Sequence, residues 1–283
     1  MEWLLDPQER DRSPLRSRQV PPTTTLRNLG RKQIEGLCSA LGIPDQVDRT
    51  RTAFDLLSST WGDGPIARPR FKSDITDDSS PYEFSVAFDG RAPELRVLAE
   101  AQGSRCTSFE QWNAGWRLNE QLARGYGVSL GRARRVAPLF EPKAAGLTFA
   151  LWHAASFRPA HPDFRVYFNP QARGRSQAMP QVHTALETLG MGGSAAWMKR
   201  YFAQGEHNPL YFSVDLSASS TARSKVYLAH PGATAERIEE LIAGLANHKP
   251  GETRAFCRQM TGSDGPWPNR PLLTCLAFRE GSV

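Results

Sequence analysis

Two side chains in the stretch FRVYFNPQARG, Arg165 and Tyr167, are of types that could do chemistry. They alternate with Phe164, Val166 and Phe168, so a strand would place the cation and the phenol on one face and the apolar residues on the other. An arginine can hold an anion, and a neighbouring aromatic ring attracts positive charge. The stretch therefore indicates a strand with one chemically active face.

The pattern recurs along the chain. SKVYLAHPGA contains Lys225 and Tyr227, and LRVLAEAQGS contains Arg96. The basic residues of the three stretches lie roughly 60 to 70 residues apart, a spacing that indicates an internal repeat.

The elements between these stretches repeat in the order helix, helix, strand, strand. Apolar spacing predicts helices over 28–41, 46–61, 109–123, 132–140, 180–189, 195–203, 233–246 and 252–260. It predicts strands over 83–88, 95–101, 146–153, 164–168, 210–216, 225–228 and 271–278. Residues 1–24 are expected to form a mobile N-terminal arm, and residues 25–283 one α+β domain with a seven-stranded antiparallel sheet.

The polar faces of these strands have two interpretations. A polar face can simply be solvated, as in many antiparallel sheets. If instead the sheet closes with its helices outside, the rows of Arg, Lys and Tyr converge on a lumen. Cations gathered there would repel one another unless an anion such as a diphosphate completes the set. With aromatic rings beside them, they suit a reaction that releases a diphosphate and a carbocation together.

One acid, Glu83 in DDSSPYEFSVAF, falls on the same inward row, among cations that should keep it ionised. A buried carboxylate could accept a hydrogen bond from an indole N–H and make that ring a better nucleophile. A structural salt bridge to Arg96 is the alternative, and the sequence leaves both open.

Composition and net charge exclude some classes of binding partner but do not identify one. The 283 residues carry a net charge of +6, which favours an anionic partner. Nucleic acid is disfavoured because the cations fall on the tyrosine-bearing rows rather than in an exposed stripe. No apolar run approaches the length of a membrane span, and the N-terminus lacks a secretion signal, so we expect a cytoplasmic protein without membrane contact.

The acidic stretch DITDD, with Asp74, Asp77 and Asp78, is similar to motifs that hold magnesium diphosphate in other enzymes. Here it precedes a Ser-Ser-Pro turn and has no acidic counterpart, so a solvated loop is expected. The histidines show no metal-ligand spacing, and we expect no metal site.

Taken together, the motifs resemble the indole prenyltransferases of the dimethylallyltryptophan synthase type, and the bacterial members most. The resemblance covers about residues 25 to 279 and is carried by SSPYEFSVAF, PELRVLAE, FRVYFNP, ARSKVYLAH and RPLLTCLAF. It implies the ABBA barrel, an antiparallel barrel surrounded by helices in ααββ repeats. It also implies metal-independent transfer of a dimethylallyl group from dimethylallyl diphosphate to the indole of tryptophan, without a cofactor.

The resemblance implies a role for each matching residue. Glu83 would engage the indole N–H. The diphosphate would be bound by Arg96, Arg165, Arg223 and Lys225, and the allyl cation would be shielded by Tyr167 and Tyr227. For the final ring proton, the family uses a basic residue on the first strand of its second unit. Here that strand offers His153 as the candidate catalytic residue and Trp152 as an aromatic wall.

The chain also departs from the family. It supplies three and a half ααββ units where the family has five, so the barrel should be incomplete and its open edge could support self-association. An inactive barrel fragment that binds a phosphorylated or aromatic ligand is therefore one alternative. A prenyltransferase that acts on tyrosine or an indole-containing peptide is another.

Overall fold

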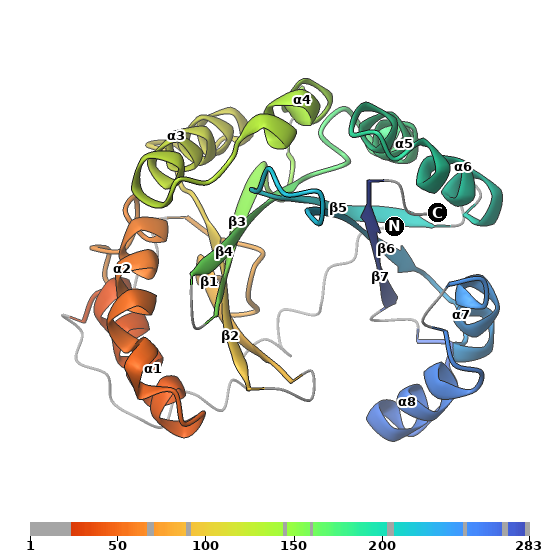
Figure 1. Cartoon of the computed structure of the whole chain (residues 1–283), viewed down its shortest axis with the longest axis horizontal. Coiled ribbons are helices and arrows are strands. Elements are labelled where there is room, and N and C mark those ends of the chain that lie inside the picture. Colours follow the sequence, from red (N-terminus) through yellow and green to blue (C-terminus); the bar gives the residue numbers. More distant parts are fainter. Residues whose placement is uncertain are drawn as a thin grey trace.

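A ring of helices surrounds a curled antiparallel sheet in the computed structural model (Figure 1). The structure describes residues 24–66, 71–88, 92–143, 146–158, 161–202, 207–245, 248–267 and 271–280. Within them the helices are α1 (Leu26–Ala40), α2 (Val47–Leu57), α3 (Ser108–Tyr126), α4 (Gly131–Phe140), α5 (Ala178–Thr188), α6 (Gly192–Tyr201), α7 (Ala235–Ile242) and α8 (Glu252–Thr261). None of these described helices is long and apolar enough to cross a membrane. Most of the expected N-terminal arm lies outside the described residues.

The sheet contains seven described strands in the order of the chain. They are β1 (Tyr82–Ala87), β2 (Glu94–Glu100), β3 (Leu151–Phe157), β4 (Pro162–Phe168), β5 (Asn208–Asp215), β6 (Arg223–His230) and β7 (Leu272–Arg279). Each pairs antiparallel with the next, so β1 and β7 are the two edges. The predicted fold class is confirmed: this is an incomplete barrel built from ααββ units.

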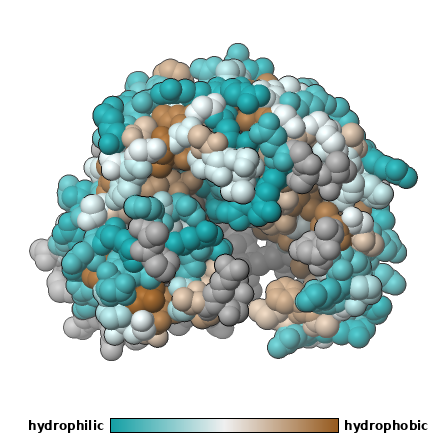
Figure 2. All heavy atoms as spheres, in the orientation of Figure 1, coloured by the Kyte–Doolittle hydropathy of each residue, from teal (hydrophilic) through white to brown (hydrophobic). Residues whose placement is uncertain are grey.

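Alternation along each strand separates two faces of the sheet. On β4, Phe164, Val166 and Phe168 are buried in the main hydrophobic core, which lies between the sheet and the helices. Arg165 and Tyr167 alternate with them and therefore occupy the opposite face, which we call the concave face. In the space-filling view the molecule is hollowed between the α1–α2 and α7–α8 ends of the helix layer (Figure 2). The helices therefore cover one face only, and the polar rows point inside the curl.

Side-chain caps set the start of one helix in three of the four pairs. The hydroxyl of Thr25 accepts a hydrogen bond from the backbone N–H of Asn28, and Thr107 and Thr234 do the same for α3 and α7. Such caps satisfy backbone donors that have no partner within the helix. They fix the residue at which each of these three helices begins.

The strand predicted over 146–153 begins later, at Leu151. The reason lies in the hydrogen bond that the side chain of Asn169 donates to the backbone carbonyl of Phe149 at 2.9 Å. This carbonyl is therefore satisfied by a side chain rather than by a neighbouring strand. The alternation is unchanged by the shift, and Trp152 still falls on the concave face.

Helix α3 approaches β3 closely at Gly115. A Cβ atom there would lie 2.8 Å from side-chain atoms of Leu151, so a larger residue would push the helix away from the sheet. This close approach brings α3 directly over His153, which is fully buried.

Candidate active site

The concave face gathers most of the residues that the sequence singled out. In register order, Arg165 lies beside Asp215, Tyr167 lies beside Ser213, and Ser213 lies beside Lys225. The side chains of Arg96, Trp152, Arg223 and Tyr227 share this face. Charges also act across the curl: burial, then the charge of Asp74, then that of Glu83 on β1 raise the pKa of Tyr211 on β5.

A carboxylate holds two of the cations together. Asp215 Oδ1 accepts a hydrogen bond from Arg165 Nε at 2.9 Å, and Asp215 Oδ2 accepts one from Arg223 Nε at 3.1 Å. The backbone N–H of Arg223 donates to the same Oδ2 at 3.0 Å. Burial would raise the pKa of Asp215, but the charges of the two arginines and these hydrogen bonds outweigh it, and the pKa is lowered. Asp215 therefore stays ionised between Arg165 and Arg223.

Both arginines bind Asp215 through Nε, and Arg165 also has a hydrogen bond to Tyr167. A guanidinium group carries five N–H donors, so each arginine can bind a second anion as well. Arg165 is buried, and its pKa is raised because Tyr167 and Asp215 outweigh its desolvation. Lys225 lies on the neighbouring row, and its pKa is lowered by burial and then by the charge of Arg165. A lysine crowded by cations gains from an incoming anion, so Arg165, Arg223 and Lys225 are arranged in a way that can hold a group of high negative charge.

Arg96 is placed differently. Its Nε donates to Glu94 Oε1 at 2.6 Å, and Glu94 also binds Arg158. Its strand neighbours are Ser85 and Ser156, at the other end of the concave face from Lys225. The sheet therefore brings Arg165, Arg223 and Lys225 together and leaves Arg96 at the rim.

Tyrosines cover the centre of the concave face. The hydroxyls of Tyr167 and Tyr227 lie 3.4 Å apart, and their ring centroids are 5.8 Å apart. Tyr211 packs edge-on against Tyr227 at 5.7 Å. Aromatic rings in this arrangement exclude water and present electron-rich faces to a cation. Tyr211 had no assigned role in the sequence analysis, although its strand alternation places it on this face.

Glu83 lies on the concave face of β1, opposite Leu98, and is accessible from that side. Partial burial and then the charge of Asp77 raise its pKa. The expectation that neighbouring cations keep Glu83 ionised is therefore corrected, because the charge that acts on it is an acid. Arg96 forms its ion pair with Glu94, two residues away on the same strand.

The structure corrects the prediction for His153. Its side chain faces α3, and its Nε2 lies 3.0 Å from Asn119 Oδ1. Burial lowers the pKa of His153 to about 3, so the imidazole is neutral. A ring proton released on the concave face cannot reach it, because the sheet lies between. The strand position that faces inward carries Trp152 instead.

The segment before β1 also differs from expectation. Asp78 accepts hydrogen bonds from Thr76 and from the backbone N–H of Ser80, as in a solvated turn. Ile75, however, is buried against Trp152 and Phe149. The segment therefore reaches inside the curl instead of remaining a solvated loop.

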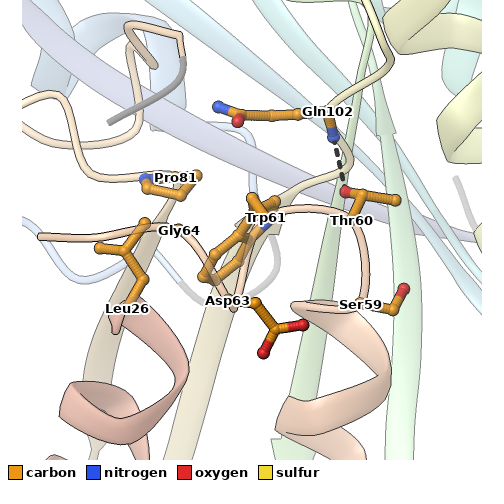
Figure 3. A pocket seen from close by; sticks show the side chains of 8 residues that line it. All are labelled: Leu26, Ser59, Thr60, Trp61, Asp63, Gly64, Pro81 and Gln102. Carbon is orange, nitrogen blue, oxygen red and sulfur yellow. Dashed lines mark hydrogen bonds between the residues drawn. The ribbon is translucent and has the colours of Figure 1, made fainter. Parts of the chain in front are cut away.

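Among the described residues, no group of three or more His, Cys, Asp or Glu side chains is placed to hold a metal ion. A cavity of about 160 Å³ lies at the start of α1, lined by Trp61, Gln102, Pro81 and neighbours (Figure 3). None of the predicted site residues lines it. Binding pockets for small ligands are typically some 300 Å³ or larger, so this cavity is too small for a prenyl diphosphate and an indole.

Comparison with known proteins agrees with this geometry. A 6-dimethylallyltryptophan synthase from Micromonospora olivasterospora, solved with DMASPP and Trp, superposes with a TM-score of 0.85 at 28% identity, over 91% of this chain and 75% of that one. A 5-dimethylallyltryptophan synthase from Streptomyces coelicolor gives a TM-score of 0.82 at 27% identity, over 91% and 74%. The prenyltransferase PriB gives 0.81 at 29% identity, over 90% and 73%.

The sequence itself matches a family over most of its length. Residues 53–246 fit the profile of tryptophan dimethylallyltransferase, a span that contains every residue discussed above as a site candidate. The fold, the cation and tyrosine rows, and this match agree. The chain belongs to the tryptophan dimethylallyltransferase family of ABBA-barrel prenyltransferases.

Proposed function

We propose that this protein transfers a dimethylallyl group from dimethylallyl diphosphate to the indole of L-tryptophan by metal-independent electrophilic aromatic substitution. The observation that carries the proposal is the Arg165–Asp215–Arg223 arrangement beside Lys225, with Tyr167 and Tyr227 on the same face. Anion binding and cation shielding are thus combined on one surface. Relatives of solved structure were crystallised with tryptophan and a thiolodiphosphate analogue of the donor.

In this proposal the diphosphate lies against Arg165, Arg223 and Lys225, with Arg96 at the rim. As the carbon–oxygen bond of the donor breaks, its electron pair leaves with the diphosphate, where these cations stabilise the new charge. The allyl cation that remains lies against Tyr167 and Tyr227, which exclude water. In this proposal three side-chain cations stabilise the negative charge of the departing diphosphate, which magnesium ions stabilise in many other enzymes.

Glu83 acts on the acceptor. Its carboxylate accepts a hydrogen bond from the indole N–H, which increases the electron density of the ring. The ring attacks the allyl cation and a carbon–carbon bond forms. The ring then loses a proton to the released diphosphate, the base that the first step leaves in the same site, and regains aromaticity. The raised pKa of Glu83 places its ionisation closer to neutral pH than that of an ordinary glutamate.

The test is incubation with L-tryptophan and dimethylallyl diphosphate in the presence of EDTA, followed by mass spectrometry. We expect tryptophan that is heavier by one C5H8 unit. Product that forms only with added magnesium would contradict the metal-independent step, and prenylation of L-tyrosine in preference to L-tryptophan would contradict the acceptor. Diphosphate binding without any product would favour an inactive barrel that binds a phosphorylated ligand.

Two further expectations stay proposals. The edge strand β7 exposes Leu273 and Cys275, and pairing of this edge with a second copy would give a dimer. Sedimentation velocity over a range of concentrations should then detect the dimer, and Leu273→Lys should weaken it.

The cytoplasmic location inferred from the N-terminal sequence is a prediction that fractionation of cells would test.

A further inference from the structure

Glu100 is a buried acid on the concave face. It follows Arg96 and Leu98 at two-residue spacing on β2, and its register partner on β3 is Trp152. Its exposed fraction is 0%. None of the steps described above uses this carboxyl group, although a buried acid is costly unless its oxygens are bonded.

The hydrogen-bond partners of Glu100 are neutral donors. Oε1 accepts from Trp152 Nε1 at 3.2 Å and from Gln111 Nε2 at 3.4 Å. Oε2 accepts from Gln102 Nε2 at 3.4 Å, and the side chain of Ser73 also bonds to the carboxyl. An ionised carboxylate only accepts hydrogen bonds, so this set of donors matches the charged form.

These partners come from separate parts of the fold. Trp152 belongs to β3, Gln111 to α3, and Ser73 to the segment before β1. Trp61, which follows α2, donates to the backbone carbonyl of Glu100 at 2.7 Å. Glu100 therefore connects two strands, a helix and two loops at one end of the concave face.

The same end is closed by an apolar group, here called the end cluster, that consists of Ile75, Phe149 and Trp152. The rings of Phe149 and Trp152 stack with centroids 4.1 Å apart. Leu98, Tyr167 and Tyr211 pack against this cluster. Of its members, Trp152 is the one that a polar bond to Glu100 holds in a fixed orientation.

The end cluster lies close to the proposed acceptor position. Glu83 is opposite Leu98, and Leu98 is opposite Ala154. Ala154 follows Trp152 by two residues on β3 and therefore shares its face. Adjacent strands are about 4.8 Å apart, so an indole bonded to Glu83 would extend over Leu98 and Ala154 toward the end cluster. Ala154 presents only a methyl group at this position.

We propose that Glu100 is a positioning residue that fixes the indole of Trp152, and with it the end cluster, as the wall against which the acceptor ring is oriented. The inference rests on the proposed acceptor chemistry. A wall that moves would let the ring rotate, and a different ring carbon would then face the allyl cation. Glu100 would in this way determine both the affinity for the acceptor and the ring position that is alkylated.

The ionisation of Glu100 supports this view. Burial raises its pKa to about 7, although the hydrogen bonds from Trp152, Ser73 and Gln102 act in the opposite direction, and Asp74 raises it further. Protonation would place a donor where the partners are also donors. The wall should therefore be held most firmly above neutral pH, and the spread of product isomers should narrow as the pH rises from 6 to 8 (about one unit either side of that pKa).

The experiment compares the wild type with Glu100→Gln, Trp152→Phe and the double variant. Glu187→Gln, in an exposed ion pair on α5, is the matched control. L-tryptophan is titrated calorimetrically into protein saturated with dimethylallyl thiolodiphosphate, and the product isomers are separated by chromatography. Pyrophosphate affinity is measured in parallel.

We expect each single variant to weaken tryptophan binding about fivefold and to broaden the isomer distribution. Trp152→Phe removes the N–H that Glu100 accepts from, and Glu100→Gln turns one accepting oxygen into an N–H that faces other donors. Pyrophosphate affinity should stay within about twofold in all variants, and the double variant should match Trp152→Phe within about twofold, because Glu100 acts through Trp152. If Glu100→Gln is insoluble, Trp152→Phe removes the hydrogen bond between Trp152 and Glu100 directly and carries the test.

Two results would overturn the inference. One is an unchanged isomer distribution and an unchanged tryptophan affinity in Glu100→Gln, or in Trp152→Phe if Glu100→Gln is insoluble. The other is a loss of affinity in the double variant that equals the sum of the losses in the single variants. A wild type that binds the thiolodiphosphate but not tryptophan would instead overturn the proposed acceptor. The two failures are thus distinguishable.

Discussion

Asp215 Oδ1 lies 2.9 Å from Arg165 Nε, and the second oxygen of the same carboxylate binds Arg223. An acid at the centre of a site for an anion is at first unexpected, because it repels the ligand. It also orients two guanidinium groups and compensates their charge before the ligand arrives. The two effects make opposite predictions for one substitution.

Asp215→Asn removes a negative charge and one acceptor. If orientation of the arginines dominates, pyrophosphate should bind about tenfold more weakly even though the site becomes more positive. Isothermal titration with pyrophosphate measures this directly. Asp48→Asn, on the outer surface of α2, makes the same change in net charge far from the site. Tighter pyrophosphate binding by Asp215→Asn would show that repulsion dominates.

Glu83→Gln should lower kcat about 100-fold or more, because an amide cannot provide the ionised acceptor for the indole N–H. Pyrophosphate affinity should be unchanged, since Glu83 lies on β1, away from Arg165, Arg223 and Lys225. Steady-state kinetics and the pyrophosphate titration together separate the two roles. Retained turnover in this variant would rule out the role proposed for Glu83.

Asp77→Asn should shift the pH profile of the reaction. The charge of Asp77 contributes to the raised pKa of Glu83, so its removal lowers that pKa. The acid limb of kcat/KM should move to lower pH, because Glu83 then stays ionised further into acid. A profile that does not move, in a variant of normal stability, would argue that Glu83 does not control this limb.

His153 and Glu100 should affect the pH dependence of stability in opposite directions. His153 has a pKa of about 3 in the fold against 6.5 ordinarily, so its contribution is complete above pH 6.5 and is lost as the pH falls. Glu100 has a pKa of about 7 against 4.5 ordinarily, so its contribution is complete below pH 4.5 and is lost as the pH rises. Between these ordinary values the two slopes, each about 1.4 kcal/mol per pH unit, oppose each other.

Urea unfolding from pH 5 to pH 6.5 tests this cancellation. Relative to the wild type, the free energy of unfolding should rise more steeply with pH in Glu100→Gln and less steeply in His153→Gln. His153→Gln should also lose stability overall, because it disturbs the fully buried contact with Asn119. Its folded fraction should keep wild-type turnover, and a strong loss of turnover would return His153 to the reaction.

Much of the fold could be predicted from the sequence, since alternation along β4 and β6 separates apolar from chemical faces with few exceptions. Alternation within the strands expected over 95–101 and 210–216 also puts Glu100, Tyr211 and Asp215 on the concave face. What it could not supply is the pairing between them. Asp215 bonds two arginines, and Arg96 bonds Glu94. Both pairings depend on strand register and on the length of the side chains, and residue spacing in the sequence predicts neither.

The start of β3 was the main local error. Residues 146–150 have the composition of a strand, yet the bond from Asn169 to the carbonyl of Phe149 ends the ladder there. The family's base on this strand led to His153 as the candidate. Alternation over 146–153, however, places His153 on the outward row with Leu151, and the structure shows it facing α3. The environment of Glu83 was missed because Asp77 belongs to a segment whose folded path follows no periodic pattern.

The strand order has a consequence for how the molecule forms. Because each strand pairs with its immediate neighbour in the chain, a nascent polypeptide can add one hairpin at a time to a sheet that already exists. Among the described strands, each one can pair as soon as the next strand in the chain has been synthesised. Assembly of this kind tolerates differences in the number of repeats, as solenoid proteins do.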